Sequence, residues 1–424
     1  MGNSQSSSTP TDPRFVSASR SFAQKELDEL RSLFASLASQ SQSNGKYISP
    51  SVFQAYFGLH GPLGERMFDL VTRKRKDHQL TFEDLVIAKG TYEKGTKDEI
   101  EEFVYQLLDV SGDGLLGRTD LESSLAVIFE IIFKPSDCGP KLGSLQDAVG
   151  IFLNAAKFSE HGEGNGEATM SFADFRSWCT IVPSVRKFLG SLLMPPDPGR
   201  PGSQVPHLLQ LESIDSNLML LRKEYAWHIG GALPQQELEE WKLLYHSSCH
   251  GLSFNTFLGN LSNHEGPTVL IIKDKDGCIY GGYASQPWER HGDFYGDMKS
   301  FLFKLYPEAS LFRPTGANHN TQWCAVNFSS ESIPNGVGFG GRVHHFGLFL
   351  SASFDQGHTF SCTTFGSPCL SKTNRIHPEV IECWGVVTKG ADQDKHDVVK
   401  ATVLERFKED RNMLKMVGLA NSSE

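Results

Sequence analysis

One stretch organises the first half of this chain: Asp109-Val-Ser-Gly-Asp-Gly-Leu-Leu-Gly-Arg-Thr-Asp120. Oxygen-bearing side chains stand at its first, third, fifth and twelfth positions, and a glycine stands at the sixth, where an EF-hand loop turns sharply. Ca²⁺ needs six to eight oxygen ligands, so a backbone carbonyl and a water would complete the set. The predicted metal ligands are Asp109, Ser111, Asp113, the Leu115 carbonyl, a water near Gly117, and Asp120.

The sequence on each side of this loop predicts a helix. Residues 98–108 place apolar side chains on one helical face, with acidic residues in the first turn, and residues 121–131 continue a second apolar stripe. The alternative interpretation is a surface turn between two helices that binds no metal. Asp120 has a shorter side chain than the usual bidentate Glu, and Ser111 carries no charge, so weak Ca²⁺ binding or Mg²⁺ occupancy is a second alternative.

An internal repeat extends this pattern over residues 21–193. Apolar positions followed by Ser, Thr or Gly recur at Ile48, Leu80, Leu116 and Met170. This periodicity predicts an all-α domain of four EF-hand-like units in two pairs, in which each apolar loop residue faces its partner. The first two loops lack acidic residues at most ligand positions, and the acidic residues of the fourth, around Glu163 and Glu167, are out of register with Met170. We therefore expect these three loops to pair without binding metal.

The first six residues, Met1-Gly-Asn-Ser-Gln-Ser6, fit the pattern for N-myristoylation of Gly2. Residues 1–20 are rich in Ser, Thr and Pro and are expected to form a disordered tail. A single myristoyl chain holds a membrane with an association constant of roughly 10⁴ M⁻¹. We therefore expect reversible, peripheral membrane attachment.

Composition narrows the class of protein. The chain has 424 residues, a formal net charge of −10 and no long basic stripe, so nucleic-acid binding is not expected. Its eight cysteines show no C-x-x-C spacing and no secretory segment precedes them. Reduced thiols and a cytoplasmic location are expected.

The run Pro195-Pro-Asp-Pro-Gly-Arg-Pro-Gly202 predicts a linker over residues 194–205, because it can sustain neither a helix nor a strand. Residues 207–246 are expected to be helical. From Gly266 the pattern changes to strands, with a hairpin turn at Asp276-Gly277. One further helix is expected over residues 298–305, followed by short strands. This pattern indicates an α+β domain.

Several motifs in this second half resemble the TLDc family, in particular those members that carry EF-hand-like repeats before the TLDc domain. The motifs include Gly266-Pro-Thr-Val-Leu-Ile-Ile-Lys-Asp274, Phe294-Tyr-Gly296, Ser300-Phe-Leu-Phe303, Phe339-Gly-Gly341 and Glu382-Cys-Trp-Gly385. The resemblance covers residues 206–388. It implies an antiparallel β-sandwich with flanking helices, no established enzymatic activity, and a cytosolic protein at lysosomal or vacuolar membranes. It also implies oxidative-stress resistance, binding to the vacuolar proton ATPase, and a link to the TOR kinase pathway.

The alternative function is an antioxidant or hydrolytic enzyme that uses TLDc cysteines or histidines. Ser253, His250 and Glu382 have the residue types of a hydrolytic triad. However, the chain has no G-x-S-x-G nucleophile elbow, no phosphate-binding loop and no H-E-x-x-H motif. No catalytic residue is therefore predicted.

Residues 389–424 are expected to form an amphipathic C-terminal helix. Its apolar face could insert into a groove of a partner or lie on the TLDc core. The predicted partner-binding residues are Val399, Val403, Phe407 and Leu414. Together these features predict a multidomain, non-catalytic, Ca²⁺-responsive membrane adaptor.

Overall fold

The computed structural model describes residues 12–41, 45–73, 77, 79–133, 142–159, 168–196, 199–211, 214–215 and 218–387. The chain divides into two compact units, with the boundary near residues 180–184 and 204–205. The predicted C-terminal helix and the residues around Gly2 lie outside the described ranges. Within those ranges, no helix has the length and apolar character needed to cross a bilayer.

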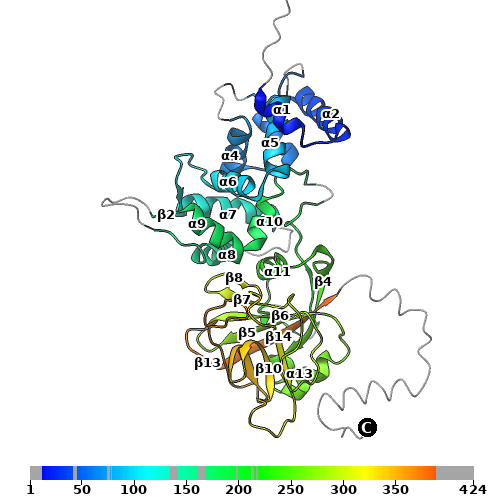
Figure 1. Cartoon of the computed structure of the whole chain (residues 1–424), viewed down its shortest axis with the longest axis vertical. Helices are drawn as coiled ribbons and strands as arrows, with labels where there is room; N and C mark the ends of the chain where they lie inside the picture. Colours follow the sequence, from blue (N-terminus) through cyan, green and yellow to red (C-terminus); the bar gives the residue numbers. More distant parts are fainter. Residues whose placement is uncertain are drawn as a thin grey trace, which may run out of the picture. The chain divides into compact units, whose positions relative to one another are not determined.

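The first unit is helical (Figure 1). Its elements are α1 (Pro13–Ser19), α2 (Gln24–Gln40), α3 (Pro50–Phe57), α4 (Gly61–Val71), α5 (Phe82–Lys94), α6 (Lys97–Leu108), β1 (Leu116–Gly117), α7 (Arg118–Ile132), α8 (Leu142–Asn154), β2 (Thr169–Met170), α9 (Phe172–Ile181) and α10 (Pro183–Leu189). Helices α5 and α6 begin with capping boxes, at Thr81 with Asp84 and at Thr96 with Glu99, which satisfy the first free amide groups.

The apolar loop residues of the repeat meet in two pairs. Ile48 and Leu80 form an antiparallel bridge, and Leu116 of β1 lies opposite Met170 of β2. All four side chains are buried. Each bridge joins two helix–loop–helix segments across a short shared ladder, as the spacing of the repeat indicates.

The region predicted as a linker contributes to the first unit. The buried guanidinium of Arg200 donates to the Met194 carbonyl at 2.8 Å and to the Phe57 carbonyl. The hydroxyl of Ser191 donates to the Pro201 carbonyl. Residues 185–204 therefore belong to the helical unit.

The second unit is a sandwich of two sheets with helices beside them. Its elements are β3 (His207–Leu209), α11 (Lys223–Gly230), the 3-10 helix η2 (Gln235–Glu237), β4 (Glu240–His246), α12 (Ser247–His250), α13 (Phe254–Leu261), β5 (Thr268–Asp274), β6 (Ile279–Ala284), β7 (Phe301–Tyr306), β8 (Ser310–Phe312), β9 (Gln322–Ala325), β10 (Gly336–Arg342), β11 (His345–Ser351), β12 (Gly357–His358), β13 (Arg375–Ile376) and β14 (Pro378–Val387). The strand orders are β3-β4-β14-β5-β6-β7-β8 and β13-β12-β11-β10-β9. Only the β3–β4 pair is parallel among the described strands.

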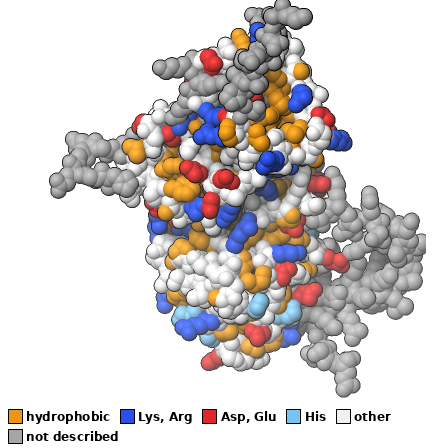
Figure 2. All heavy atoms as spheres, turned by 45° about the horizontal axis from the view of Figure 1, so that its top comes forward, with side chains coloured by type: hydrophobic (Ala, Val, Ile, Leu, Met, Phe, Trp, Pro, Cys, Tyr) orange, Lys and Arg blue, Asp and Glu red, His pale blue; other side chains and the backbone are white. Residues whose placement is uncertain are grey.

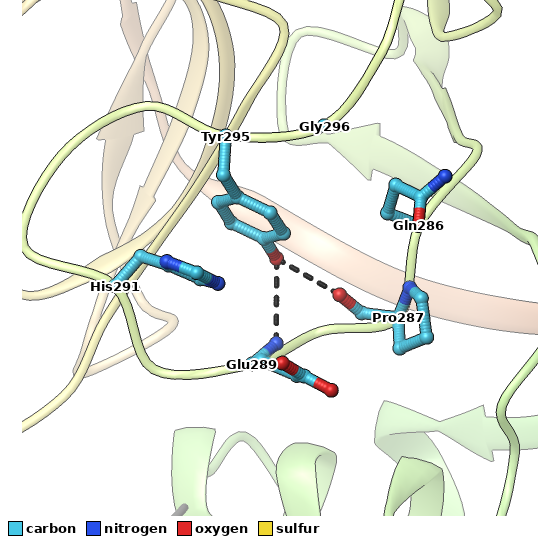
Figure 3. Close-up of a pocket in the computed structure, with 6 residues that line it drawn as sticks. All are labelled: Gln286, Pro287, Glu289, His291, Tyr295 and Gly296. Carbon is cyan, nitrogen blue, oxygen red and sulfur yellow. Dashed lines mark hydrogen bonds between the residues drawn. The ribbon is translucent and has the colours of Figure 1, made fainter.

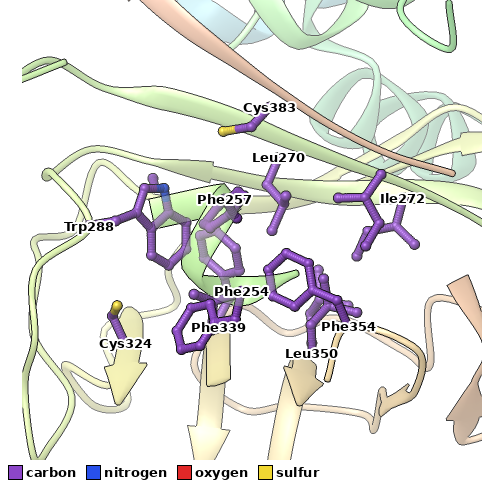
Figure 4. Packing of buried hydrophobic residues seen from close by; sticks show 14 of the residues in the cluster. Phe254, Phe257, Leu270, Ile272, Trp288, Cys324, Phe339, Leu350, Phe354 and Cys383 are labelled. Carbon is purple, nitrogen blue, oxygen red and sulfur yellow. The ribbon is translucent and has the colours of Figure 1, made fainter. Parts of the chain in front are cut away.

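The core lies between these sheets. In Figure 4, Leu270 and Ile272 of β5 face Phe339 and Leu350 of the smaller sheet, and the rings of Phe254 and Phe257 of α13 lie between them. Gly282 of β6 permits this close approach, because a Cβ atom there would lie 2.7 Å from the Phe339 ring.

Three expectations for local structure were wrong. Part of the tail that was expected to be disordered, residues 13–19, forms helix α1, because Asp12 caps its first turn and its apolar side chains pack against the buried cluster of Phe22, Leu30 and Val86. The helix expected over residues 298–305 is absent: residues 301–306 form strand β7, because pairing with β6 and β8 and burial of the aromatic residues Phe301 and Phe303 favour the extended form. The described part of residues 207–246 includes the helix α11 and the short 3-10 helix η2, but it begins and ends in strands. In β4, buried Trp241, Leu243 and Tyr245 alternate with more exposed residues, which is the period of a strand.

Burial of a histidine in α11 makes the stability of this unit depend on pH. Desolvation lowers the pKa of His228 from 6.5 to about 3. The unfolded chain takes up this proton below pH 6.5 and the folded chain does not, so the contribution is present above pH 6.5 and is lost as pH falls toward 3. We expect about 1–2 kcal/mol of stability to be lost between pH 7 and pH 5, and His228→Leu to remove this loss. Urea denaturation of both proteins at the two pH values tests this, and equal losses would contradict it.

Candidate functional site

The third loop, residues 109–120, brings together three of the predicted ligand side chains. The Oδ1 atom of Asp109 accepts from Ser111 Oγ at 3.2 Å, and that hydroxyl lies 3.5 Å from Asp120 Oδ2. The carboxylates of Asp109 and Asp120 are both buried, and both lie near the Ser111 hydroxyl. Burying a carboxylate is costly unless hydrogen bonds or a positive charge compensate it.

Backbone amides also hold the two carboxylates. Asp109 accepts from the amides of Gly112 at 2.8 Å and Gly114 at 3.1 Å. Asp120 accepts from the amide of Ser111 at 3.0 Å and from that of Gly117 at 3.1 Å. The left-handed conformation of Gly114, with φ of +92°, allows the turn that aims its amide at Asp109.

The fourth predicted side-chain ligand, Asp113, does not bond to this pair of carboxylates. Asp113 is exposed, and its Oδ1 atom accepts from the Leu115 amide at 2.8 Å. The Leu115 side chain is 55% exposed. Within the described ranges, no three His, Cys, Asp or Glu side chains gather as a metal site.

A positive charge at the loop comes from Arg66 of α4, which the sequence analysis did not identify. Its Nη2 atom donates to Asp109 Oδ2 at 2.9 Å, and its Nε atom donates to the Gln106 carbonyl at 2.9 Å. The Arg66 side chain is only 6% exposed. The sequence did contain an indication of this role: Arg66 is the one basic residue among the apolar residues of α4, and a buried cation needs an acidic partner.

The chemistry of the donor set fits Ca²⁺ or Mg²⁺, since carboxylate, hydroxyl and carbonyl oxygens are the ligands of hard cations. Asp109, Ser111 and Asp120 would hold such an ion most closely. One carboxylate oxygen of Asp109 is already bound by Arg66, so this oxygen is not available to a metal ion without a change in that contact.

The residues of the conceivable hydrolytic triad do not come together. Ser253 caps α13 by accepting from the Thr256 amide, and His250 Nδ1 accepts from the His246 amide at 3.0 Å. Glu382 lies in the fully buried interior of β14, where it bonds to none of these. It accepts from the amides of Leu220 and Leu221, from the Trp384 indole, and lies 3.5 Å from His246 Nε2.

The cysteines that the structure describes are free thiols; Cys249 is exposed, Cys369 is half-buried, and the others are buried. Burial raises the pKa of Cys179 to about 12, and it also raises the pKa of the Cys324 and Cys383 thiols. The Cys369 thiol faces the carbonyls of Thr359, Ser371 and Thr373 at 3.3–3.5 Å. A peroxide-reducing cysteine needs an accessible thiolate, and the buried thiols do not provide one.

An open polar cavity of about 260 Å³ lies on the loop between β6 and β7 (Figure 3). The ring of His291 stacks on that of Tyr295 with centroids 4.1 Å apart. The Tyr295 hydroxyl donates to the Pro287 carbonyl at 3.1 Å, and burial raises the pKa of this phenol. The cavity is lined by Gln286, Pro287, Glu289, His291, Tyr295 and Gly296.

A buried glutamine holds this loop against the smaller sheet. Gln322 of β9 is fully buried, and its amide group donates to the Gln286 carbonyl and accepts from the Gln286 amide. Thr321 donates to the Tyr295 carbonyl at 2.7 Å. Gly296 has φ of +95°, and a Cβ atom there would lie 2.7 Å from Thr321 Oγ1. The cavity therefore has a firmly positioned wall, lined by groups that can form hydrogen bonds and by no cysteine or serine.

On the face drawn in Figure 2, acidic and basic side chains are interspersed. A protein that binds nucleic acid usually presents a basic stripe. This face has no such stripe.

The remaining predicted site residues lie outside the described residues. They are the lipidation site Gly2 and the partner-binding residues Val399, Val403, Phe407 and Leu414.

Comparison with known proteins identifies the second unit. The family model of the TLDc domain matches residues 214–387. MTOR-associated protein MEAK7 of Danio rerio is 31% identical over 284 residues, which cover 64% of this chain and 61% of that protein. The Gallus gallus protein of the same name is 27% identical over 95% of this chain and 94% of its own length. Oxidation resistance protein 1 of Rattus norvegicus is 33% identical over 34% of this chain and 16% of its own length.

Proposed function

Because residues 214–387 of this chain are a TLDc domain and the chain is related to the MEAK7 proteins, we propose that it is a non-catalytic peripheral membrane adaptor. Its TLDc domain binds a protein complex, for which we propose the vacuolar proton ATPase. The setting is TOR-linked signalling and resistance to oxidative stress at the lysosomal or vacuolar membrane. The printed names of the relatives, MTOR-associated protein and oxidation resistance protein, support this setting.

One observation carries the proposal. The groups of the TLDc domain that resemble catalytic residues are already bound to backbone groups, as Glu382 is to the amides of Leu220 and Leu221. In contrast, the loop from Gln286 to Gly296 is held rigidly and presents an open polar cavity. A fixed polar surface without an available nucleophile suits recognition of a partner better than covalent catalysis.

The two ends of the chain complete the proposed adaptor. A myristoyl group on Gly2 supplies reversible membrane attachment, and the apolar residues Val399, Val403, Phe407 and Leu414 supply a second contact with the partner. Ca²⁺, or Mg²⁺ in its place, acts at the third loop through Asp109, Ser111 and Asp120. The ion would neutralise the negative charges of Asp109 and Asp120.

Isolation of the full-length protein from cells, in Ca²⁺ or in a chelator, tests the proposal. We expect mass spectrometry to find subunits of the vacuolar proton ATPase in the isolated complex, with recovery that differs between the two conditions. Glu289→Lys reverses the charge at the mouth of the cavity and is expected to lower this recovery about tenfold.

Glu379→Lys is the matched control, since Glu379 is half-exposed on β14 and pairs only with Lys273 among the described residues. Recovery should be unchanged in this variant. Absence of the ATPase subunits in both conditions would contradict the proposed partner. Peroxide consumption or ester hydrolysis by the purified protein would favour the enzymatic alternative.

A further inference from the structure

The charge balance of the third loop depends on a residue from outside it. Asp109 uses both of its carboxylate oxygens: Oδ1 accepts from Gly112 and Ser111, and Oδ2 accepts from Gly114 and Arg66. Among the described residues, Arg66 is the only basic side chain within ion-pair distance of this carboxylate. Its side chain and that of Asp109 are 6% and 5% exposed, so water screens their attraction little.

The guanidinium also lies over the loop backbone. A Cβ atom on Gly112 would be 3.0 Å from Arg66 Nη1, so the loop approaches the guanidinium closely at a residue with φ of +75°. The third contact, from Nε to the Gln106 carbonyl, fixes the guanidinium at the C-terminal end of α6. Arg66 thus binds the carboxylate of Asp109, the first residue of the loop. A bound metal ion would neutralise the same negative charge.

We propose that Arg66 is the resident cation of the third loop, and that a divalent ion binds there only by displacing the guanidinium from Asp109. The loop keeps its hydrogen bonds without metal because Arg66 supplies the missing charge. Metal binding then breaks a contact between α4 and the third loop, which links the ion to the packing of α4 against α6. This inference rests on the proposed Ca²⁺ response and explains how that response reaches α4, in the first pair of EF-hand-like units.

Calorimetric titration of the full-length protein with Ca²⁺ tests the inference. Arg66→Gln removes the charge and keeps a polar side chain, and we expect it to bind Ca²⁺ about tenfold more tightly than the wild type. Its melting temperature in chelator should fall, because Asp109 loses its counter-charge, and should rise again on addition of Ca²⁺. A merely structural role for Arg66 would lower the melting temperature without this recovery.

Two variants complete the design. Arg66→Lys keeps a positive charge and should bind Ca²⁺ as weakly as the wild type. Arg73→Gln removes another ion-paired arginine of the same unit, which is partly exposed and pairs with Asp12 and Asp84 and not with the third loop. It should lower stability without any gain in Ca²⁺ affinity.

Equal Ca²⁺ affinity in the wild type and Arg66→Gln would overturn the inference and leave the proposed Ca²⁺ response standing. Failure of both proteins to bind Ca²⁺ would overturn the inference together with that response, whereas the adaptor function is tested separately by recovery of the ATPase subunits. If Arg66→Gln does not fold in chelator, restoration of its helical circular dichroism by Ca²⁺ would support the inference. Failure of Ca²⁺ to restore it would overturn it.

Discussion

Glu382→Ala is expected to lower the free energy of unfolding of the TLDc domain by about 3–5 kcal/mol. The carboxylate is fully buried in β14 and accepts from the Leu221 amide at 3.1 Å and the Trp384 indole at 2.8 Å, as well as from the Leu220 amide. Alanine leaves these buried donors without an acceptor, and each loss costs about 1–3 kcal/mol.

His246 adds to the expected effect. Its Nδ1 atom accepts from the Ser248 amide at 3.1 Å, so a neutral ring carries its proton on Nε2, which faces Glu382 and the Leu218 carbonyl. Burial raises the pKa of Glu382, whereas the amides, the indole and His246 lower it. These donors offset part of the desolvation cost, and they also anchor the segment before α11 to the central strand.

Urea denaturation of the full-length protein, followed by the fluorescence of its tryptophans, measures this effect. Glu379→Ala on the same strand is the matched control, because its carboxylate is half-exposed and its pair with Lys273 is worth at most about 1 kcal/mol. A similarly small loss of stability in both variants would show that Glu382 does not hold the segment before α11.

The second large effect is expected at the C-terminal segment. Val403→Asp with Phe407→Asp places two charges on the predicted apolar face of residues 389–424. If this face is an anchor in a partner groove, each substitution should weaken binding at least about 30-fold, as loss of an interface hot spot does. Quantitative recovery of the ATPase subunits with the full-length variant measures the change.

Lys400→Ala with Lys408→Ala is the control for the opposite face, and it should leave recovery nearly unchanged. A TLDc domain with unaltered urea stability in the Val403 and Phe407 variant would exclude unfolding as the cause of lost binding. If recovery is normal while TLDc stability falls, the segment instead lies on its own domain, which was the alternative interpretation of its amphipathic pattern.

Local patterns predicted much of the fold. Ile48, Leu80, Leu116 and Met170 could be recognised as loop partners because an apolar residue followed by Ser, Thr or Gly recurs in each repeat. The hairpin at Gly277 followed from a turn that requires a positive φ, and its φ is +81°. The TLDc resemblance is confirmed by the family match over residues 214–387.

Two of the wrong predictions concern segments whose secondary structure is decided by pairing with other strands. The segment at Phe301 contains a run of apolar residues compatible with either a helix or a buried strand, and only its neighbours β6 and β8 select the strand. The same limit applies to the sites. Arg66 lies 43 positions from Asp109, and Gln322 lies 36 positions from Gln286, so no local pattern indicates either contact.

The most direct test of the central claim is binding between purified components. Full-length protein is mixed with the purified peripheral sector of the vacuolar proton ATPase, and size-exclusion chromatography separates complexes from free protein. The adaptor proposal predicts co-elution of the wild type and of Glu379→Lys, and loss of co-elution for the Val403 and Phe407 variant. Separate elution of a correctly folded wild-type protein, in Ca²⁺ and in chelator alike, would contradict it.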